Sequence, residues 1–310
     1  MKVIFMGTPR FAVPTLRALA DAGYGVLAVY TQPDRPKGRG QKTAFSPVKE
    51  CAVELGLEVR QPERVRRPEV VAEIAALAPR VMVVVGYGQI IPQSIIDIPP
   101  YGIINVHASL LPKYRGAAPI QWAIARGEPR TGVTTMKINA GLDTGDMLLA
   151  KSIAIGAEDT AATLHDRLAA LGAELIVQAL ERAAQGTLER RPQPQAGATY
   201  AAKIDKREAA IDWTLAADVI ERRLRAFDPF PGATSKLGGE TVKFWRARVV
   251  DAAGAPGEIV AANDEGVVVA CGRQALCVVE LQSPGGRRLA AGPFIAARRL
   301  APGQRFGTAG

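Results

Sequence analysis

The sequence predicts an α/β domain with a Rossmann-like open parallel sheet, followed by a small OB-like β-barrel domain. Up to about residue 185, short apolar segments alternate with helical patterns, which is typical of a mostly parallel sheet covered on both faces. Residues 186–199 are rich in proline, glycine, glutamine and alanine, as in a linker. Short alternating segments then follow between turns, which favours a small closed barrel. With 310 residues, 48% of them hydrophobic, the chain can bury two cores. We expect an α/β domain over 1–189, a linker over 190–206 and the barrel over 207–310.

The elements of the first domain follow from local patterns. Residues 81–85 read Val-Met-Val-Val-Val, which is typical of a central parallel strand buried on both faces. Ser46 before Pro47 supplies the cap and the first position of a helix. The expected strands are 2–6, 25–31, 81–85, 102–107 and 134–138, and the expected helices are 11–22, 47–55, 69–77, 118–126 and 160–184.

Beyond the linker, one helix precedes several strands. Residues 214–227 form a helical pattern with a charged face, which the run Asp-Pro-Phe-Pro-Gly from Asp228 ends. Turn residues then separate short segments of strand pattern. The expected strands are 241–249, 257–261, 267–270 and 276–281.

Polar side chains follow the predicted strand 102–107. Asn105 and His107 are two residues apart, so a strand places both on one face, while Ile104 and Val106 point the other way. A hydrogen-bonded pair at a strand end is the structural alternative to a functional one. Asp143 lies in a Gly-rich loop, where an aspartate often caps a turn. Because ligands bind at the carboxyl ends of parallel strands, we expect a site formed by Asn105, His107 and the loop at 86–88.

Several common classes of site are disfavoured by the motifs. A dinucleotide site needs Gly-x-Gly-x-x-Gly after the first strand, but the chain reads Gly-Thr-Pro-Arg-Phe from Gly7. There is no Walker-type loop, and Cys51, Cys271 and Cys277 lack the spacing of a disulfide framework or a zinc site. No apolar run of about 18 residues or amino-terminal leader pattern is present. We expect a cytoplasmic, monomeric protein without a metal.

The stretch from Asn105 to Gly116 resembles the signature of the 10-formyltetrahydrofolate-dependent formyltransferases. Residues 5–9, 31–36, 115–122, 132–134 and 141–148 are similar to the members that act on initiator methionyl-tRNA, so the resemblance covers nearly the whole chain. It implies that Asn105, His107 and Asp143 surround the transferred formyl group. It also implies 10-formyltetrahydrofolate as formyl donor, bound by backbone and side chains of Ser109, Leu110, Leu111, Pro112, Tyr87, Gly88, Gln89, Ile90 and Gly141.

Positive charge is concentrated between residues 35 and 49, which contain five basic residues and no acid. On charge alone, a solvated loop and a phosphate-binding loop are equally good interpretations. The resemblance implies that this loop contacts the acceptor end of tRNA through Arg35, Lys37, Arg39 and Lys42, with Arg39 the most important. The formal net charge of +9 permits a polyanionic partner. The resemblance likewise implies that the barrel binds tRNA.

The resulting hypothesis is formyl transfer to an amine through a tetrahedral oxyanion. Asn105 and a protonated His107 are suited to donate to that oxygen, with Asp143 orienting the imidazole or holding a water. The resemblance implies that the acceptor is the α-amino group of methionyl initiator tRNA. Transfer to a nucleotide or amino-sugar amine is the alternative, and a non-enzymatic RNA-binding protein on the same fold is a third.

Overall fold

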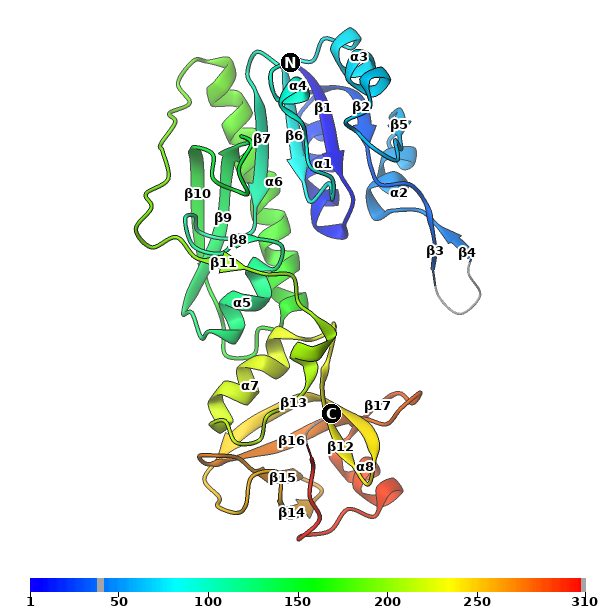
Figure 1. The fold of residues 1–310 in the computed structure, drawn as a ribbon, viewed down its shortest axis with the longest axis vertical. Helices are drawn as coiled ribbons and strands as arrows, with labels where there is room; N and C mark the ends of the chain where they lie inside the picture. Colours follow the sequence, from blue (N-terminus) through cyan, green and yellow to red (C-terminus); the bar gives the residue numbers. More distant parts are fainter. Residues whose placement is uncertain (38–41, 308–310) are drawn as a thin grey trace. The chain divides into compact units, whose positions relative to one another are not determined.

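The computed structural model describes residues 1–37 and 42–307 of the chain (Figure 1). Arg39, the most prominent residue of the predicted RNA loop, lies outside the described residues. The described chain forms two compact units. One contains Met1–Pro119, Thr131–Ile153 and His165–Ala201, and the other contains Ile120–Arg130, Ala154–Leu164 and Ala202–Gly310. None of the described helices is long and apolar enough to cross a membrane.

A seven-stranded sheet, in the order β10-β9-β7-β6-β1-β2-β5, forms the centre of the first unit. Its strands are β1 (Lys2–Gly7), β2 (Gly25–Tyr30), β5 (Val59–Arg60), β6 (Val81–Val85), β7 (Ile103–His107), β9 (Arg130–Lys137) and β10 (Met147–Ala154). The five strands from β5 to β7 run parallel, and β9 runs antiparallel to β7. Strand order reverses between β1 and β6, where open α/β sheets form their ligand crevice.

Helices bury both faces of this sheet. On one face, Ile4, Met6 and Met82 form a core with residues of α3 (Pro68–Ala76) and α4 (Gln93–Ile96). On the other face, α6 (Ala161–Ala184) approaches β7 so closely that a Cβ atom on Gly172 would lie 2.6 Å from Cγ1 of Val106. Alternation along β7 therefore turns Asn105 and His107 away from α6.

Among the remaining elements of this part of the chain, the helices match the sequence patterns, whereas the short paired strands were not predicted. A short 3-10 turn, Arg10–Ala12, leads into α1 (Val13–Asp21), and α2 is Pro47–Glu54, with α5 at Pro119–Ala125. Ser46 caps α2 as predicted, because its Oγ accepts a hydrogen bond of 3.0 Å from the Lys49 amide. A hairpin of β3 (Arg35–Lys37) and β4 (Lys42–Ala44) occupies the basic loop. A separate two-stranded parallel sheet joins β8 (Arg115–Gly116) to β11 (Tyr200–Ala201) (Figure 1).

The second unit contains an antiparallel sheet in the order β12-β13-β16-β15-β14, with β17 paired to β16. The strands are β12 (Ala233–Leu237), β13 (Glu240–Val250), β14 (Ile259–Asn263), β15 (Gly266–Ala270), β16 (Ala275–Gln282) and β17 (Arg288–Ala290). Near the end of the described chain, Gly307 bridges Lys236 in β12 and Arg305 bridges Glu258, next to β14. These bridges join the two ends of the strand order.

The core of the second unit is partly aromatic. The rings of Trp213 and Phe306 each lie edge-on to Phe244, at centroid distances of 5.5 and 5.0 Å. The helices α7 (Ala217–Ala226) and α8 (Ala291–Arg298) contribute Ile220, Leu224 and Phe294 to the same buried cluster. A 3-10 turn, Lys206–Ala209, precedes the first of these helices. The predicted fold class, a parallel-sheet domain followed by an antiparallel β domain, is confirmed.

Candidate active site

Asn105 and His107 lie side by side at the carboxyl end of β7, as the strand pattern predicts. Both are buried, with 9% and 6% of their surface exposed. The side chain of Asn105 has no hydrogen-bond partner among the described residues. Its polar atoms are not among the described ones that are both unpaired and shut off from solvent, so the amide is available to a ligand.

Two acceptors flank the His107 ring. Nε2 lies 2.9 Å from the carbonyl oxygen of Tyr114, and Nδ1 lies 3.7 Å from Oδ2 of Asp143. A carbonyl oxygen only accepts, so Nε2 carries a proton and donates it there. Nδ1 therefore faces a carboxylate, which attracts a proton placed on that nitrogen. The arrangement suits a ring that takes up and releases a proton at Nδ1.

The Asp143 loop is tightly closed. Asn139 Oδ1 accepts hydrogen bonds from the Gly141 amide at 3.0 Å and from the Thr144 hydroxyl at 2.9 Å. A Cβ atom on Gly145 would lie 1.9 Å from the Lys137 carbonyl oxygen, so only glycine fits there. Asp143 itself has a φ of 50°, and its Oδ2 accepts a 2.9 Å hydrogen bond from the Gly116 amide. This carboxylate thus contacts backbone of another loop as well as facing His107.

The turn after β7 is held by hydroxyl groups. Ser109 is fully buried, and its Oγ donates to the Lys113 carbonyl at 2.6 Å. Thr134 Oγ1 donates to the Ser109 carbonyl at 2.8 Å and accepts from the Leu111 amide at 3.2 Å. These contacts fix the backbone of the predicted cofactor-binding run Ser109, Leu110, Leu111 and Pro112 next to His107.

The other predicted cofactor loop, Tyr87 to Ile90, presents its residues in different directions. The Tyr87 side chain points into the sheet core, where burial raises the pKa of its hydroxyl. Its carbonyl accepts from Thr8 Oγ1 at 2.9 Å and from Gln32 Nε2 at 3.1 Å. Gln89 is engaged with backbone groups at Pro62 and Val65. By contrast, Ile90 is 91% exposed.

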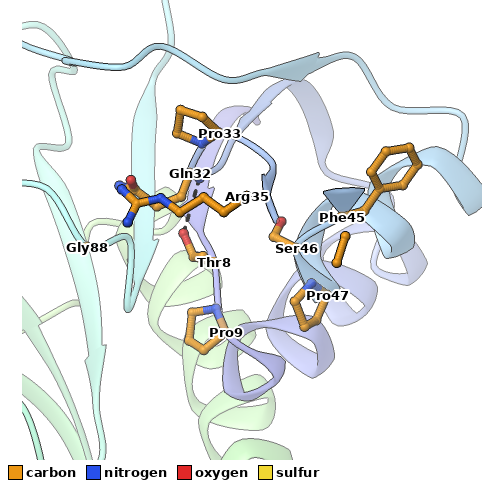
Figure 2. Close-up of a pocket in the computed structure, with 10 residues that line it drawn as sticks. Thr8, Pro9, Gln32, Pro33, Arg35, Phe45, Ser46, Pro47 and Gly88 are labelled. Atoms are coloured by element: carbon orange, nitrogen blue, oxygen red, sulfur yellow. Dashed lines mark hydrogen bonds between the residues drawn. The ribbon is translucent and has the colours of Figure 1, made fainter. Parts of the chain in front are cut away.

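A pocket of about 470 Å³ opens beside this loop, at the carboxyl ends of β1 and β2 (Figure 2). Its lining combines an aromatic ring, several prolines and polar groups: Thr8, Pro9, Gln32, Pro33, Arg35, Ala44, Phe45, Ser46, Pro47 and Gly88. Arg35, one of the predicted RNA-binding residues, is exposed at this pocket. The pocket therefore adjoins both the β3–β4 hairpin and the loop after β6.

Charge near the pocket is partly neutralised. Lys49 forms an ion pair with Asp34, and its ammonium also lies 3.9 Å from the centroid of the Phe45 ring. Lys37 and Lys42 belong to the paired strands β3 and β4. Arg35 differs from Lys49 because it makes no ion pair with a described residue.

Sequence reasoning did not single out Gln193. Its side chain donates to the carbonyl oxygens of Asp143 and Gly145, at 2.9 and 2.8 Å, and accepts from Arg115. It lies between two prolines in the segment expected as a linker, and no spacing or charge pattern marks it there. The contacts arise only when distant parts of the chain meet.

Comparison with known families matches almost the whole chain. A model described as formyl transferase matches residues 1–180, and a model described as formyl transferase, C-terminal domain, matches residues 203–299. The methionyl-tRNA formyltransferase of Geobacter metallireducens is 51% identical over 307 residues, covering 99% of each chain. That of Burkholderia vietnamiensis is 54% identical over 317 residues, covering 99% of this chain and 97% of its own.

Solved structures share the fold at low sequence identity. HypX from Aquifex aeolicus, in complex with tetrahydrofolic acid, gives a TM-score of 0.63 at 20% identity over 95% of this chain. This chain spans about half of that protein's length, 47%. An N-formyltransferase from Helicobacter canadensis, in complex with folinic acid and dTDP-3-aminofucose, gives 0.65 at 19% identity, covering 90% of this chain and 99% of its own. With both family models matched and curated relatives at about half identity over nearly full length, the chain belongs to the formyl transferase family.

Proposed function

We propose that this protein transfers the formyl group of 10-formyltetrahydrofolate to the α-amino group of methionyl initiator tRNA. The observation that carries the proposal is the Asn105, His107 and Asp143 cluster at the carboxyl edge of the sheet, in a chain 51% identical to a methionyl-tRNA formyltransferase over 99% of both chains. The cluster supplies the chemistry, and the relatives point to the acceptor.

The reaction makes one bond and breaks one. The amine nitrogen attacks the formyl carbon, and the carbonyl electrons move onto oxygen. When they return, the bond between that carbon and N10 of the folate breaks. The Asn105 amide, which lacks a partner among the described residues, is suited to donate to the oxyanion. Donors aimed at such an oxygen are among the strongest contributions to acyl-transfer catalysis.

Proton balance assigns a role to the imidazole. The attacking amine must lose a proton and the departing folate nitrogen must gain one. His107 is held through Nε2 by the Tyr114 carbonyl, which leaves Nδ1 on the side of Asp143. An imidazole exchanges protons readily near neutral pH, so this edge is suited to the transfer, directly or through one water. Asp143 stabilises the protonated ring.

Two exposed apolar side chains support folate binding at the predicted loops. Ile90 is 91% exposed and Leu142 is 62% exposed, on the loops that contain Gly88 and Gly141. Large aliphatic side chains on otherwise polar loops are typical of ligand contacts. The backbone of these loops offers donors and acceptors for a pterin edge, and the residues that we assign to it are Tyr87, Gly88, Gln89, Ile90 and Gly141, with Ser109 to Pro112 lining the remainder.

The acceptor is tested by direct competition. Purified protein is supplied with 10-formyltetrahydrofolate and either charged initiator tRNA or small amines, including a nucleotide-linked amino sugar. We expect efficient formylation of the tRNA and at most weak transfer to the small amines. Transfer to small amines with none to tRNA would overturn the proposed acceptor. Absence of transfer to any amine would support the non-enzymatic alternative.

A further inference from the structure

The segment from Arg191 to Ala201, here called the strap, is attached at its two ends and at Gln193 to the elements around the candidate active site. We propose that Gln193 of the strap is a positioning residue of the active site, holding the Asp143 loop against the turn that ends at Gly116. The inference rests on the proposed formyl transfer, since it concerns the same three side chains. It assigns a role to a segment whose composition suggests only a spacer.

The side-chain amide of Gln193 makes three hydrogen bonds. Its Nε2 donates to the carbonyl oxygens of Asp143 at 2.9 Å and of Gly145 at 2.8 Å. Its Oε1 accepts from Nε of Arg115 at 3.0 Å, and Arg115 is only 3% exposed. One side chain therefore ties the loop that carries Asp143 to the strand β8.

Backbone contacts fasten the strap on either side of Gln193. Before it, Arg191 and Met147 exchange two backbone hydrogen bonds, of 2.8 and 2.9 Å, at the start of β10. After it, Thr199 accepts from the Tyr114 amide through Oγ1 at 2.8 Å and from the Arg115 amide through its carbonyl at 2.9 Å. Such regular backbone pairing is not typical of a flexible spacer.

The strap and the turn are in close contact where β8 meets β11. Gly116 has a φ of +112°, and a Cβ atom there would lie 2.8 Å from the Ala201 carbonyl oxygen. Only glycine adopts this conformation and allows this approach without strain. The glycine at position 116 therefore permits the close packing of the strap against this turn.

Both groups that flank His107 depend on these contacts. The Tyr114 carbonyl, which accepts from Nε2, belongs to a residue whose amide is bound by Thr199. The Asp143 carboxylate, which faces Nδ1, belongs to a residue whose carbonyl is bound by Gln193. A catalytic group displaced by about 1 Å can lose about 100-fold in rate. Loss of the Gln193 amide therefore removes the hydrogen bonds that hold the loop carrying Asp143 in place.

The test compares two glutamines of the strap in the full-length protein. Gln193→Ala removes the three hydrogen bonds, whereas Gln195→Ala removes an exposed side chain with no hydrogen bond to a described residue. We expect Gln193→Ala to lower kcat by about 10- to 100-fold per folded molecule while the KM for tRNA changes less than about twofold. Gln195→Ala should behave like the unmodified protein.

A second variant separates positioning from stability. Gln193→Glu keeps an acceptor for Arg115 but loses both donors to the loop carbonyls, so we expect a retained melting temperature with a kcat reduced at least as far as in Gln193→Ala. An unchanged kcat in both variants, or a loss accounted for entirely by unfolded protein, would show that the strap is only structural.

A measurement without substrate keeps this test independent of the proposed function. Hydrogen exchange at the Gly116 amide and across residues 141–146 should be at least about tenfold faster in Gln193→Ala than in Gln195→Ala, because the loop opens more often. Equal exchange in the two variants would overturn the proposed positioning role of Gln193. Failure of the unmodified protein to formylate tRNA would instead overturn the proposed function.

Discussion

At the scale of single residues, the informative feature is the side-chain amide of a largely buried residue, which has no partner within the described part of the chain. Asn105 sits beside His107 with 9% of its surface exposed and no partner among the described residues. Asn105 is not among the described residues whose unpaired polar atoms are shut off from solvent, so its amide is open to a ligand, which favours a role in binding or catalysis.

Asn105→Ala tests that role. We expect kcat to fall by about 100- to 1,000-fold, because one donor to the oxyanion is lost, which corresponds to about 2.7–4 kcal/mol of barrier. The melting temperature should change little, since the Asn105 side chain has no hydrogen bond to a described residue to lose. Steady-state kinetics and thermal unfolding measure the two effects. A kcat near that of the unmodified protein would exclude Asn105 as the oxyanion donor.

Tyr87 offers the opposite case, a residue of a predicted cofactor loop whose side chain belongs to the core. Its hydroxyl is buried without a hydrogen-bond partner among the residues described. We expect Tyr87→Phe to raise the free energy of unfolding by about 1 kcal/mol and to leave the KM for folate unchanged. Chemical denaturation and folate titration of the rate provide the measurement. A raised KM would indicate that the hydroxyl itself contacts the ligand.

The residue-level predictions from sequence succeed where one strand decides the geometry. The spacing of Asn105 and His107 was enough to place both on one face, because strand alternation is local. The proximity of Asp143 to His107 depended on how two loops fold back on each other, and only the resemblance indicated it. Gln193 could not be found at all, since its partners are 48 to 78 residues away in sequence.

At the scale of elements, β9 combines two kinds of environment. Its middle residue Thr134 supports the turn after β7 in the candidate active site, while Lys137 at its end is largely buried and donates to the Tyr101 carbonyl. Burial, and to a smaller extent the like charge of Arg190, lower the pKa of Lys137 from 10.5 to about 8. A lysine in the last residue of a buried strand thus opposes folding when it is charged.

This shift predicts how stability depends on pH. Between about pH 8 and 10.5 the unfolded chain holds a proton on Lys137 that the folded chain has released, so the free energy of unfolding rises with pH in this window. In Lys137→Met this contribution disappears. We expect the variant to be more stable than the unmodified protein below pH 8, with the difference shrinking towards pH 10.5. A difference that stays constant across the window would contradict the shifted pKa.

Elements with strong local signals were predicted, and edge elements were not. The capped start of α2 and the apolar run of β6 were recognised because each is specified by adjacent residues. β10 was missed since only Leu148 of its eight residues is buried, as an edge strand permits. The hairpin β3–β4 was missed for a similar reason, because its strands are three residues each and carry basic side chains rather than an apolar alternation.

At the scale of the whole molecule, alternation along the chain predicted the parallel sheet and its coverage by helices. It did not predict the strand order, the antiparallel entry of β9 or the pairing of β8 with β11, because these depend on contacts between distant segments. The net charge of +9 is a further property of the entire molecule, with no single residue responsible for it.

That charge predicts a salt dependence that separates the two substrates. The KM for charged tRNA should rise steeply with ionic strength, by close to one power of salt concentration for each phosphate contacted. The KM for the small folate should change far less, since few charges are screened. Initial rates between 50 and 200 mM salt, with each substrate varied in turn, measure both slopes. Equal slopes would argue against a polyanionic acceptor.

The bridges made by Arg305 and Gly307 bear on how copies of this chain behave towards one another. Together they occupy the free sides of β12 and of the residues next to β14, and Phe306 between them is 1% exposed. Strand sides left open recruit strands from neighbouring molecules. A chain shortened before Arg305 would leave both of these strand sides open at once. We expect this variant to self-associate in solution. Light scattering would detect the growing particles, in addition to any decrease in melting temperature.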